Sequence, residues 1–319
     1  LVLVGFVLGL RLDRERLARY GRAVFSVSVC EVLGVAALMA LGLIALGVPL
    51  ELALLLGGIA PASAPAAIRD VIEEGGARGP FTDLLTGIVA VDDAWGLIAF
   101  SMLLAATQTV VADAGAASAL VFGLREVGGA LALGAAIGVP AAYLTGRVRP
   151  GEPTRIEALG IVFLCGGLAL VLGVSFLLAA MVTGLAIANL ARHHDRPRRE
   201  IETFEQPFLV LFFILAGAAL EVGALAELGL VGAAYILLRT GGLWLGGWLG
   251  ARLAGLSGPR ARLVGLAIAP QAGVALGMAL VAKSRFPEVG DMLLGIVIST
   301  TVVFELIGPL ATLLAERRV

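Results

Sequence analysis

Residues 57–72, GGIAPASAPAAIRDVI, and residues 265–277, GLAIAPQAGVALG, decide the expected fold of this chain. Each is an apolar stretch that proline interrupts near its centre. The residues at the two interruptions are Pro61 and Pro65 in the first stretch, and Pro270, Gln271 and Gly273 in the second. Proline removes a backbone donor and clashes with the preceding helical turn, and lipid tolerates such a broken backbone only where protein or a polar cavity covers it. The two stretches therefore predict two discontinuous membrane helices.

The composition of the whole chain predicts an all-α polytopic membrane protein. Apolar residues make up 59% of the sequence, charged residues only 15%, and the mean hydropathy is +1.00, whereas soluble domains carry about a quarter charged residues. Apolar stretches of ~20 residues, long enough to cross a bilayer, recur along the chain. We expect a single domain over 1–319 with one partial segment and ten full ones, at 1–10, 24–47, 51–72, 83–107, 121–144, 155–172, 174–191, 205–221, 228–251, 262–283 and 289–314. Because Leu1 already lies inside an apolar run, further helices are expected to be missing from the N-terminus.

The distribution of positive charge predicts the orientation. If successive segments alternate in direction, all but four of the 23 lysines and arginines fall on one side of the membrane. Arg125, Lys283 and Arg285 fall on the other side, and Arg239 falls within a segment. Basic residues accumulate on the cytoplasmic side, so the C-terminus is expected to be cytoplasmic and the protein to cross the cell membrane many times.

The two interrupted segments hold matching positions in the chain. Each is the middle member of a trio of segments, one trio over 24–107 and the other over 228–314, and the expected orientation makes the two interrupted helices run in opposite directions. Such a pair is the sequence sign of a transporter built from inverted repeats.

The pair Asp92–Asp93, in GIVAVDDAWGLIAF (87–100), is the main candidate for ion binding. Carboxylates in the middle of an apolar helix are costly and usually face a water-filled cavity on an ion path. A carboxyl group in such surroundings can hold a proton, or release it and bind a hard monovalent cation through oxygen. Competition between the two ions for one carboxylate is enough to couple their movements.

Other polar residues inside the apolar segments are candidates for supporting roles. Arg239 stays protonated when buried and needs a partner; we expect it to pair with one of the two aspartates. Ser63 and Gln271 offer oxygen ligands beside the proline interruptions. Glu31 and Glu305 lie nearer the ends of their segments, where reaching the membrane surface or forming an accessory pair is expected more than ion binding.

Four stretches in order resemble the monovalent cation:proton antiporter superfamily, the sodium/proton exchanger domain. They are GFVLGLRLDRERLARYGR (5–22), APASAPAAIRDVIEEGG (60–76), VAVDDAWGLIAFS (89–101) and IAPQAGVALGMALVA (268–282). The resemblance covers nearly the whole chain. It departs from the family at Ala64, where many members have Asp, and at Arg239, where two-aspartate members have Lys.

The resemblance implies roles for individual residues. It implies that Asp93 carries the cation and the proton, that Asp92 pairs with Arg239, and that Ser63 replaces the Thr of the first broken helix. It also implies a homodimer that exchanges Na⁺ or K⁺ for H⁺ without a cofactor and is not an enzyme.

Three alternatives remain at this point. An intramembrane aspartyl protease needs two carboxylates that face each other, whereas Asp92 and Asp93 diverge on one helix. A passive cation channel with an acidic filter is possible in principle. A symporter of the same fold for an organic anion would meet repulsion from the aspartates.

Overall fold

The computed structural model describes residues 2–12, 14–76, 78–111, 116–145, 154–191, 229–271 and 273–319. Within these ranges the regular structure is helical and includes no strand, so the all-α prediction is confirmed. The predicted segment at 205–221 lies outside the described residues. The described chain falls into two compact units, each made of segments distant in the sequence.

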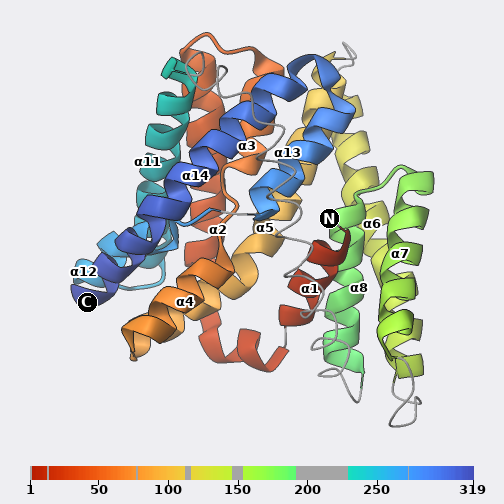
Figure 1. The fold of residues 1–319 in the computed structure, drawn as a ribbon, viewed down its shortest axis with the longest axis horizontal. Helices are drawn as coiled ribbons and strands as arrows, with labels where there is room; N and C mark the ends of the chain where they lie inside the picture. Colours follow the sequence, from red (N-terminus) through yellow and green to blue (C-terminus); the bar gives the residue numbers. More distant parts are fainter. Residues whose placement is uncertain are drawn as a thin grey trace. The chain divides into compact units, whose positions relative to one another are not determined.

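The first unit comprises residues 1–18 and 112–214. Its helices are α1 (Val2–Arg11), α6 (Ala116–Thr145), α7 (Thr154–Leu172) and α8 (Phe176–Leu190) (Figure 1). Helix α8 packs against the other three. Helices α1 and α8 cross with their backbones in contact, because a Cβ atom at Gly9 or Gly184 would overlap a backbone oxygen of the facing helix. Small residues at helix crossings are typical of membrane helix packing.

The second unit comprises residues 19–111 and 215–319 and contains both predicted trios. The first trio consists of α2 (Arg14–Ala45), α3 (Leu50–Ile59) with α4 (Pro65–Gly75), and α5 (Pro80–Val111). The second consists of α11 (Gly229–Leu253), then α12 (Gly258–Leu263), η1 (Leu266–Ile268) and α13 (Gly273–Arg285), and α14 (Pro287–Arg317). Figure 1 shows these helices side by side, α3 against α5 and α14 against α13 and α4. The two interrupted segments are therefore parts of one compact unit.

Helices α2 and α11 join the two trios through glycine. A Cβ atom added at Gly246 would lie 2.5 Å from the carbonyl oxygen of Cys30, and one at Gly250 would lie 2.5 Å from that of Ser26. The hydroxyl of Ser26 also donates to the carbonyl of Gly250 at 2.9 Å. Because of this close approach, Arg239 on α11 contacts both interrupted segments.

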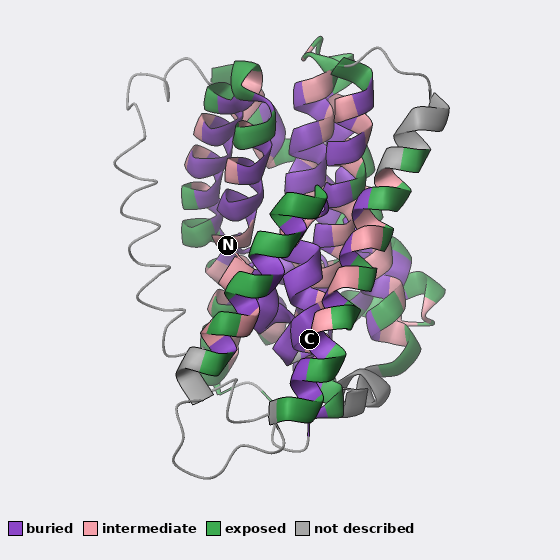
Figure 2. Cartoon of the chain, turned by 90° about the vertical axis from the view of Figure 1, so that its right-hand side faces the viewer, coloured by how far each residue is buried: buried purple, intermediate pink, exposed green. Residues whose placement is uncertain are grey.

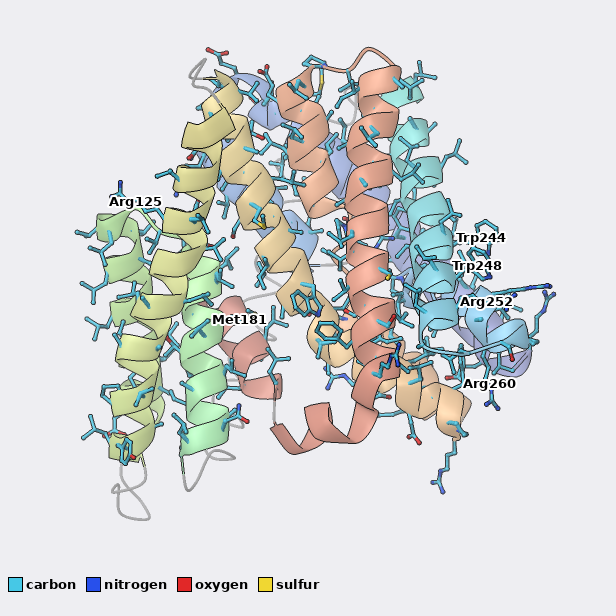
Figure 3. The ribbon with its side chains drawn as sticks, turned by 180° about the vertical axis from the view of Figure 1, so that it is seen from behind. Arg125, Met181, Trp244, Trp248, Arg252 and Arg260 are labelled. Carbon is cyan, nitrogen blue, oxygen red and sulfur yellow. The ribbon has the colours of Figure 1, made fainter. Side chains whose placement is uncertain are left out.

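Several described helices suit a membrane. Five are long and apolar enough to cross one: 21–45, 80–111, 123–144, 229–253 and 287–317. Buried and exposed residues alternate along the helices with the helical repeat (Figure 2). On the outer face of α11, Trp244 and Trp248 lie near Arg252, whose guanidinium carbon is 5.8 Å from the Trp248 ring centre (Figure 3). Tryptophan beside arginine is typical of a membrane–water interface.

Candidate ion-binding site

The first break comprises residues 60–64, between α3 and α4. Helix α3 ends at Ile59, and α4 begins at Pro65. Pro61 and Pro65 have no N–H to donate, so the helical hydrogen-bond ladder stops between them. Ser63 lies in the break and is 1% exposed. The predicted discontinuity of this segment is confirmed.

The second break comprises residues 269–271. The short η1 helix ends at Ile268, and α13 begins at Gly273. Pro270 and Gln271 are both buried and lie outside any helix. The second predicted discontinuity is also confirmed, although the segment is divided further than expected, because α12 and η1 precede the break as separate short helices.

Arg239 joins the two breaks. Its side chain is completely buried on α11. Its Nε donates to the carbonyl of Ala60 at 2.8 Å and its Nη2 donates to that of Ala62 at 2.9 Å, both in the first break. Its Nη1 donates to the carbonyl of Ala269, in the second break, at 2.7 Å. One guanidinium thus binds carbonyls that the helices themselves leave without donors.

The expected pairing of Arg239 with Asp92 stays a prediction. The three hydrogen bonds of Arg239 go to backbone oxygens, and its charge also interacts with Asp92. The guanidinium carbon also lies 4.2 Å from the centre of the Phe304 ring, on α14. The fork of an arginine can satisfy several acceptors at fixed angles, which the single ammonium of lysine cannot do as well. The backbone carbonyls of the two breaks are such acceptors.

A second polar contact holds the second break. The Nε2 of Gln271 donates to the hydroxyl of Tyr235 at 3.1 Å. Tyr235 is fully buried on α11, one helical turn before Arg239. The Oε1 of Gln271 is buried and accepts no hydrogen bond from the part of the chain that the structure describes, while Tyr235 orients the amide.

The two aspartates lie buried on α5. Asp92 is 1% exposed and Asp93 is 3% exposed. The hydroxyl of Ser28, on α2, donates to Oδ1 of Asp92 at 3.2 Å. Adjacent residues of a helix point about 100° apart, so the two carboxyl groups face different neighbours. The hydroxyl of Ser63 has no hydrogen-bond partner within the described ranges and lies near Asp92.

The two glutamates of the prediction differ in their surroundings. Glu31 is completely buried on α2 beside Asp92, and therefore does not reach toward a membrane surface. Glu305 lies on an exposed face of α14. The sequence pattern did not single out Ser28 or Tyr235. Ser28 precedes Glu31 by three residues, a spacing that puts both on one helix face, and this was the available signal.

The atoms gathered around the two breaks are chiefly oxygens: carboxyl groups, hydroxyls, an amide oxygen and backbone carbonyls. Hard monovalent cations and protons prefer such ligands. Within the described residues, no group of three or more His, Cys, Asp or Glu side chains could hold a metal ion. The chemistry of this region suits an ion that binds oxygen weakly and reversibly.

Comparisons with known proteins bear on this site. Residues 1–314 match the family described as "Sodium/hydrogen exchanger, transmembrane". The chain is 30% identical over 258 residues to the glutathione-regulated potassium-efflux system protein KefC of Cronobacter sakazakii, and 29% identical over 258 residues to KefC of Escherichia coli O45:K1. Each match covers 76% of this chain and 40% of the relative, so the chain spans about two fifths of the length of these proteins.

A solved structure shares the fold. The sodium proton antiporter MjNhaP1 of Methanocaldococcus jannaschii, determined at pH 8, matches with a TM-score of 0.79. The match covers 98% of this chain and 83% of that protein, at 17% sequence identity. The predicted antiporter fold is thus confirmed.

Proposed function

Because this chain belongs to the sodium/hydrogen exchanger family, we propose that it exchanges Na⁺ or K⁺ for protons across a membrane by alternating access. The family consists of transporters, so the chain is not an enzyme, and the aspartyl protease alternative is set aside. The relatives and the structural neighbour are named for potassium efflux and for sodium–proton exchange, and both cations are therefore candidates.

The observation that carries the proposal is the position of Arg239 between the two breaks. A buried positive charge fixes three carbonyls from both interrupted segments in the same compact unit as the buried Asp92 and Asp93. The carbonyls accept three of the hydrogen bonds of Arg239, so these donors are not directed at the carboxyl groups. A carboxyl group in this position can alternate between a proton and a cation.

The proposed roles follow the chemistry of each group. Asp93 is the carboxylate that binds the cation or the proton, Ser63 supplies a hydroxyl ligand, and Asp92 lies beside them. Arg239 stays charged and holds the breaks in place. The ions themselves are the only small molecules that exchange requires, and no cofactor is proposed.

The setting of the protein is part of the proposal. The distribution of basic residues supports a multi-pass protein of the cell membrane with a cytoplasmic C-terminus. The family resemblance supports a homodimer within the lipid bilayer.

A passive channel is the main alternative. A channel needs a continuous path lined by ligands, whereas the two breaks here are bound to one buried arginine. A symporter of this fold for an organic anion would bring a negative substrate toward two buried aspartates, which is electrostatically unfavourable. Both alternatives are outcomes of the following test.

The test is cation-driven proton movement in liposomes that contain the purified protein and an internal pH dye. Na⁺ and then K⁺ are added to the wild type, to Asp93→Asn and to Asp83→Asn. Asp83 is an exposed residue in the first turn of the same helix and is the matched control. We expect proton movement in the wild type and in Asp83→Asn, and none in Asp93→Asn. Folded wild-type protein that moves no protons with either cation would remove the antiporter proposal.

A further inference from the structure

Glu31 is a buried carboxyl group that the proposed exchange does not yet use. It lies on α2 with none of its surface exposed. Both of its carboxyl oxygens are buried, and no N–H or O–H donor of the described residues reaches either of them. The carboxyl of Asp92, on α5, lies within hydrogen-bonding reach of Glu31. Glu31 and Asp92 therefore face each other across two helices.

The surroundings of the two carboxyl groups are unequal. Asp92 accepts a hydrogen bond at Oδ1 from Ser28, at 3.2 Å, and its Oδ2 has no donor. Ser63, which is 1% exposed, lies near Asp92 in the first break. Among the described residues, Asp92 thus has one donor, Ser28, while Glu31 has none.

Charged and titratable groups surround the pair on three helices. Helices α2 and α5 contribute Glu31 and Asp92 themselves, and α5 also carries buried Asp93. Helix α11 contributes Arg239, which is close enough to interact electrostatically with both carboxyl groups, and Tyr235 beside it. The hydrogen bonds of Arg239 go to the carbonyls of the breaks, so it moderates the negative charge without placing a donor between the two acids.

Two ionised carboxylates cannot remain in contact in this arrangement. Each is only an acceptor, and two like charges in a poorly polar interior repel strongly. The contact is stable when one proton or one cation lies between the oxygens. A proton on Glu31 satisfies both groups, because the Glu31 O–H then donates to Asp92, whose charge Ser28 and Arg239 already favour.

We propose that Glu31 and Asp92 form a second proton-binding site of this transporter, and that their shared proton leaves when a monovalent cation binds. The second part of the proposal rests on the exchange function proposed above. A cation bound at Asp93 and Ser63 brings positive charge beside Asp92, which weakens the attraction of Asp92 for the shared proton, and the proton of Glu31 is released to water. The pair thereby adds a proton to the competition at Asp93.

Infrared spectroscopy of the purified full-length protein tests the pair, because a protonated carboxyl group has its own C=O stretching band. Spectra are recorded without cation and after addition of Na⁺ or K⁺, for the wild type, Glu31→Gln, Asp92→Asn, Asp93→Asn and Glu288→Gln. Glu288 is exposed in the first turn of α14 and is the control for loss of an unrelated glutamate. Gel filtration shows which variants are folded, and Glu31→Asp, which keeps an acid at this position, is recorded in case Glu31→Gln is not.

We expect a band of the pair in the wild type that the cation abolishes. It should be absent from Glu31→Gln, shifted in Asp92→Asn because the Glu31 O–H loses its carboxylate acceptor, and present in Asp93→Asn, Glu288→Gln and Glu31→Asp. A full-intensity band in folded Glu31→Gln would overturn the proposal, and so would a band of the pair in the wild type that neither cation affects. The proposed exchange fails by a different result, namely the absence of cation-driven proton movement in wild-type liposomes, which leaves the band of the pair without cation unchanged.

Discussion

The first and second breaks use proline in the same way but differ in what surrounds them. Both expose backbone carbonyls that Arg239 binds. The first break adds Ser63, whose hydroxyl approaches the buried acids. The second adds Gln271, whose amide is held by Tyr235, and its proline packs tightly against α14. Both breaks thus offer backbone carbonyls to one arginine, but we expect only the first to bind the transported ion, whereas the second is held in place by its neighbours.

The largest expected effect on stability follows from substitution of Arg239, which binds both breaks. Arg239→Met replaces the guanidinium with an unbranched apolar side chain and leaves three buried carbonyls without a donor. Each such group costs about 1–3 kcal/mol, so we expect the free energy of unfolding to fall by roughly 3 kcal/mol or more. Thermal unfolding of the purified protein measures this loss. Arg239→Lys, which keeps the charge but not the planar fork, should lose less. A Met variant as stable as the wild type would contradict the role given to Arg239.

The next largest effect is expected from added side-chain volume beside each break. A Cβ atom at Gly308, on α14, would lie 2.6 Å from Cα of Pro270 in the second break, whereas one at Gly58, beside the first break, would lie 3.1 Å from Cα of Phe100. Overpacking typically costs about 1–3 kcal/mol. We expect that cost for Gly308→Ala and a smaller one for Gly58→Ala, measured by the same unfolding experiment. The reverse order would mean that the first break is the more tightly packed.

The ion chemistry should respond only at the first break. Ser63→Ala removes one hydroxyl ligand, and we expect the cation concentration for half-maximal exchange to rise by about 3- to 10-fold, the equivalent of roughly 1 kcal/mol. Stability should change little, since the hydroxyl has no hydrogen-bond partner to lose. Exchange rates in liposomes over a range of cation concentrations provide the measurement. An unchanged half-maximal concentration would show that Ser63 does not bind the cation.

The smallest effect is expected at the second break. Tyr235→Phe removes the acceptor of the Gln271 amide and should lower the free energy of unfolding by about 0.5–1.5 kcal/mol. The half-maximal cation concentration should stay at the wild-type value, because this contact positions the break and not the ion. A shift in that concentration as large as the one for Ser63→Ala would erase the difference between the two breaks.

The sequence predicted the positions of both breaks, because proline acts on the backbone locally. It also predicted that Asp92, Asp93 and Arg239 are buried, because a charged side chain in the middle of a long apolar segment faces the protein interior and not the lipid. The backbone acceptors of Arg239 were not predictable in the same way. The carbonyls of Ala60, Ala62 and Ala269 belong to alanines, which carry no side-chain signal.

Glu31 shows a second limit of the sequence. The segment was expected to begin at 24, with Glu31 near its end, whereas α2 begins at Arg14 and bends at Gly21, where φ is 60°. The contact with Asp92 depends on how α2 and α5 approach each other, and helix packing of this kind is a tertiary property. The side-chain type indicated a possible accessory pair, and only the fold identifies Asp92 as its neighbour.

The most direct test of the account uses a proton gradient as the only driving force. Liposomes containing the full-length protein are loaded with acid buffer, held at zero membrane potential and placed in alkaline medium with radioactive sodium or rubidium ions. We expect the wild type to accumulate one of these cations above its concentration in the medium, and Asp93→Asn not to do so. Cation that only equilibrates with the medium, whatever the pH gradient, would contradict exchange and identify a passive path.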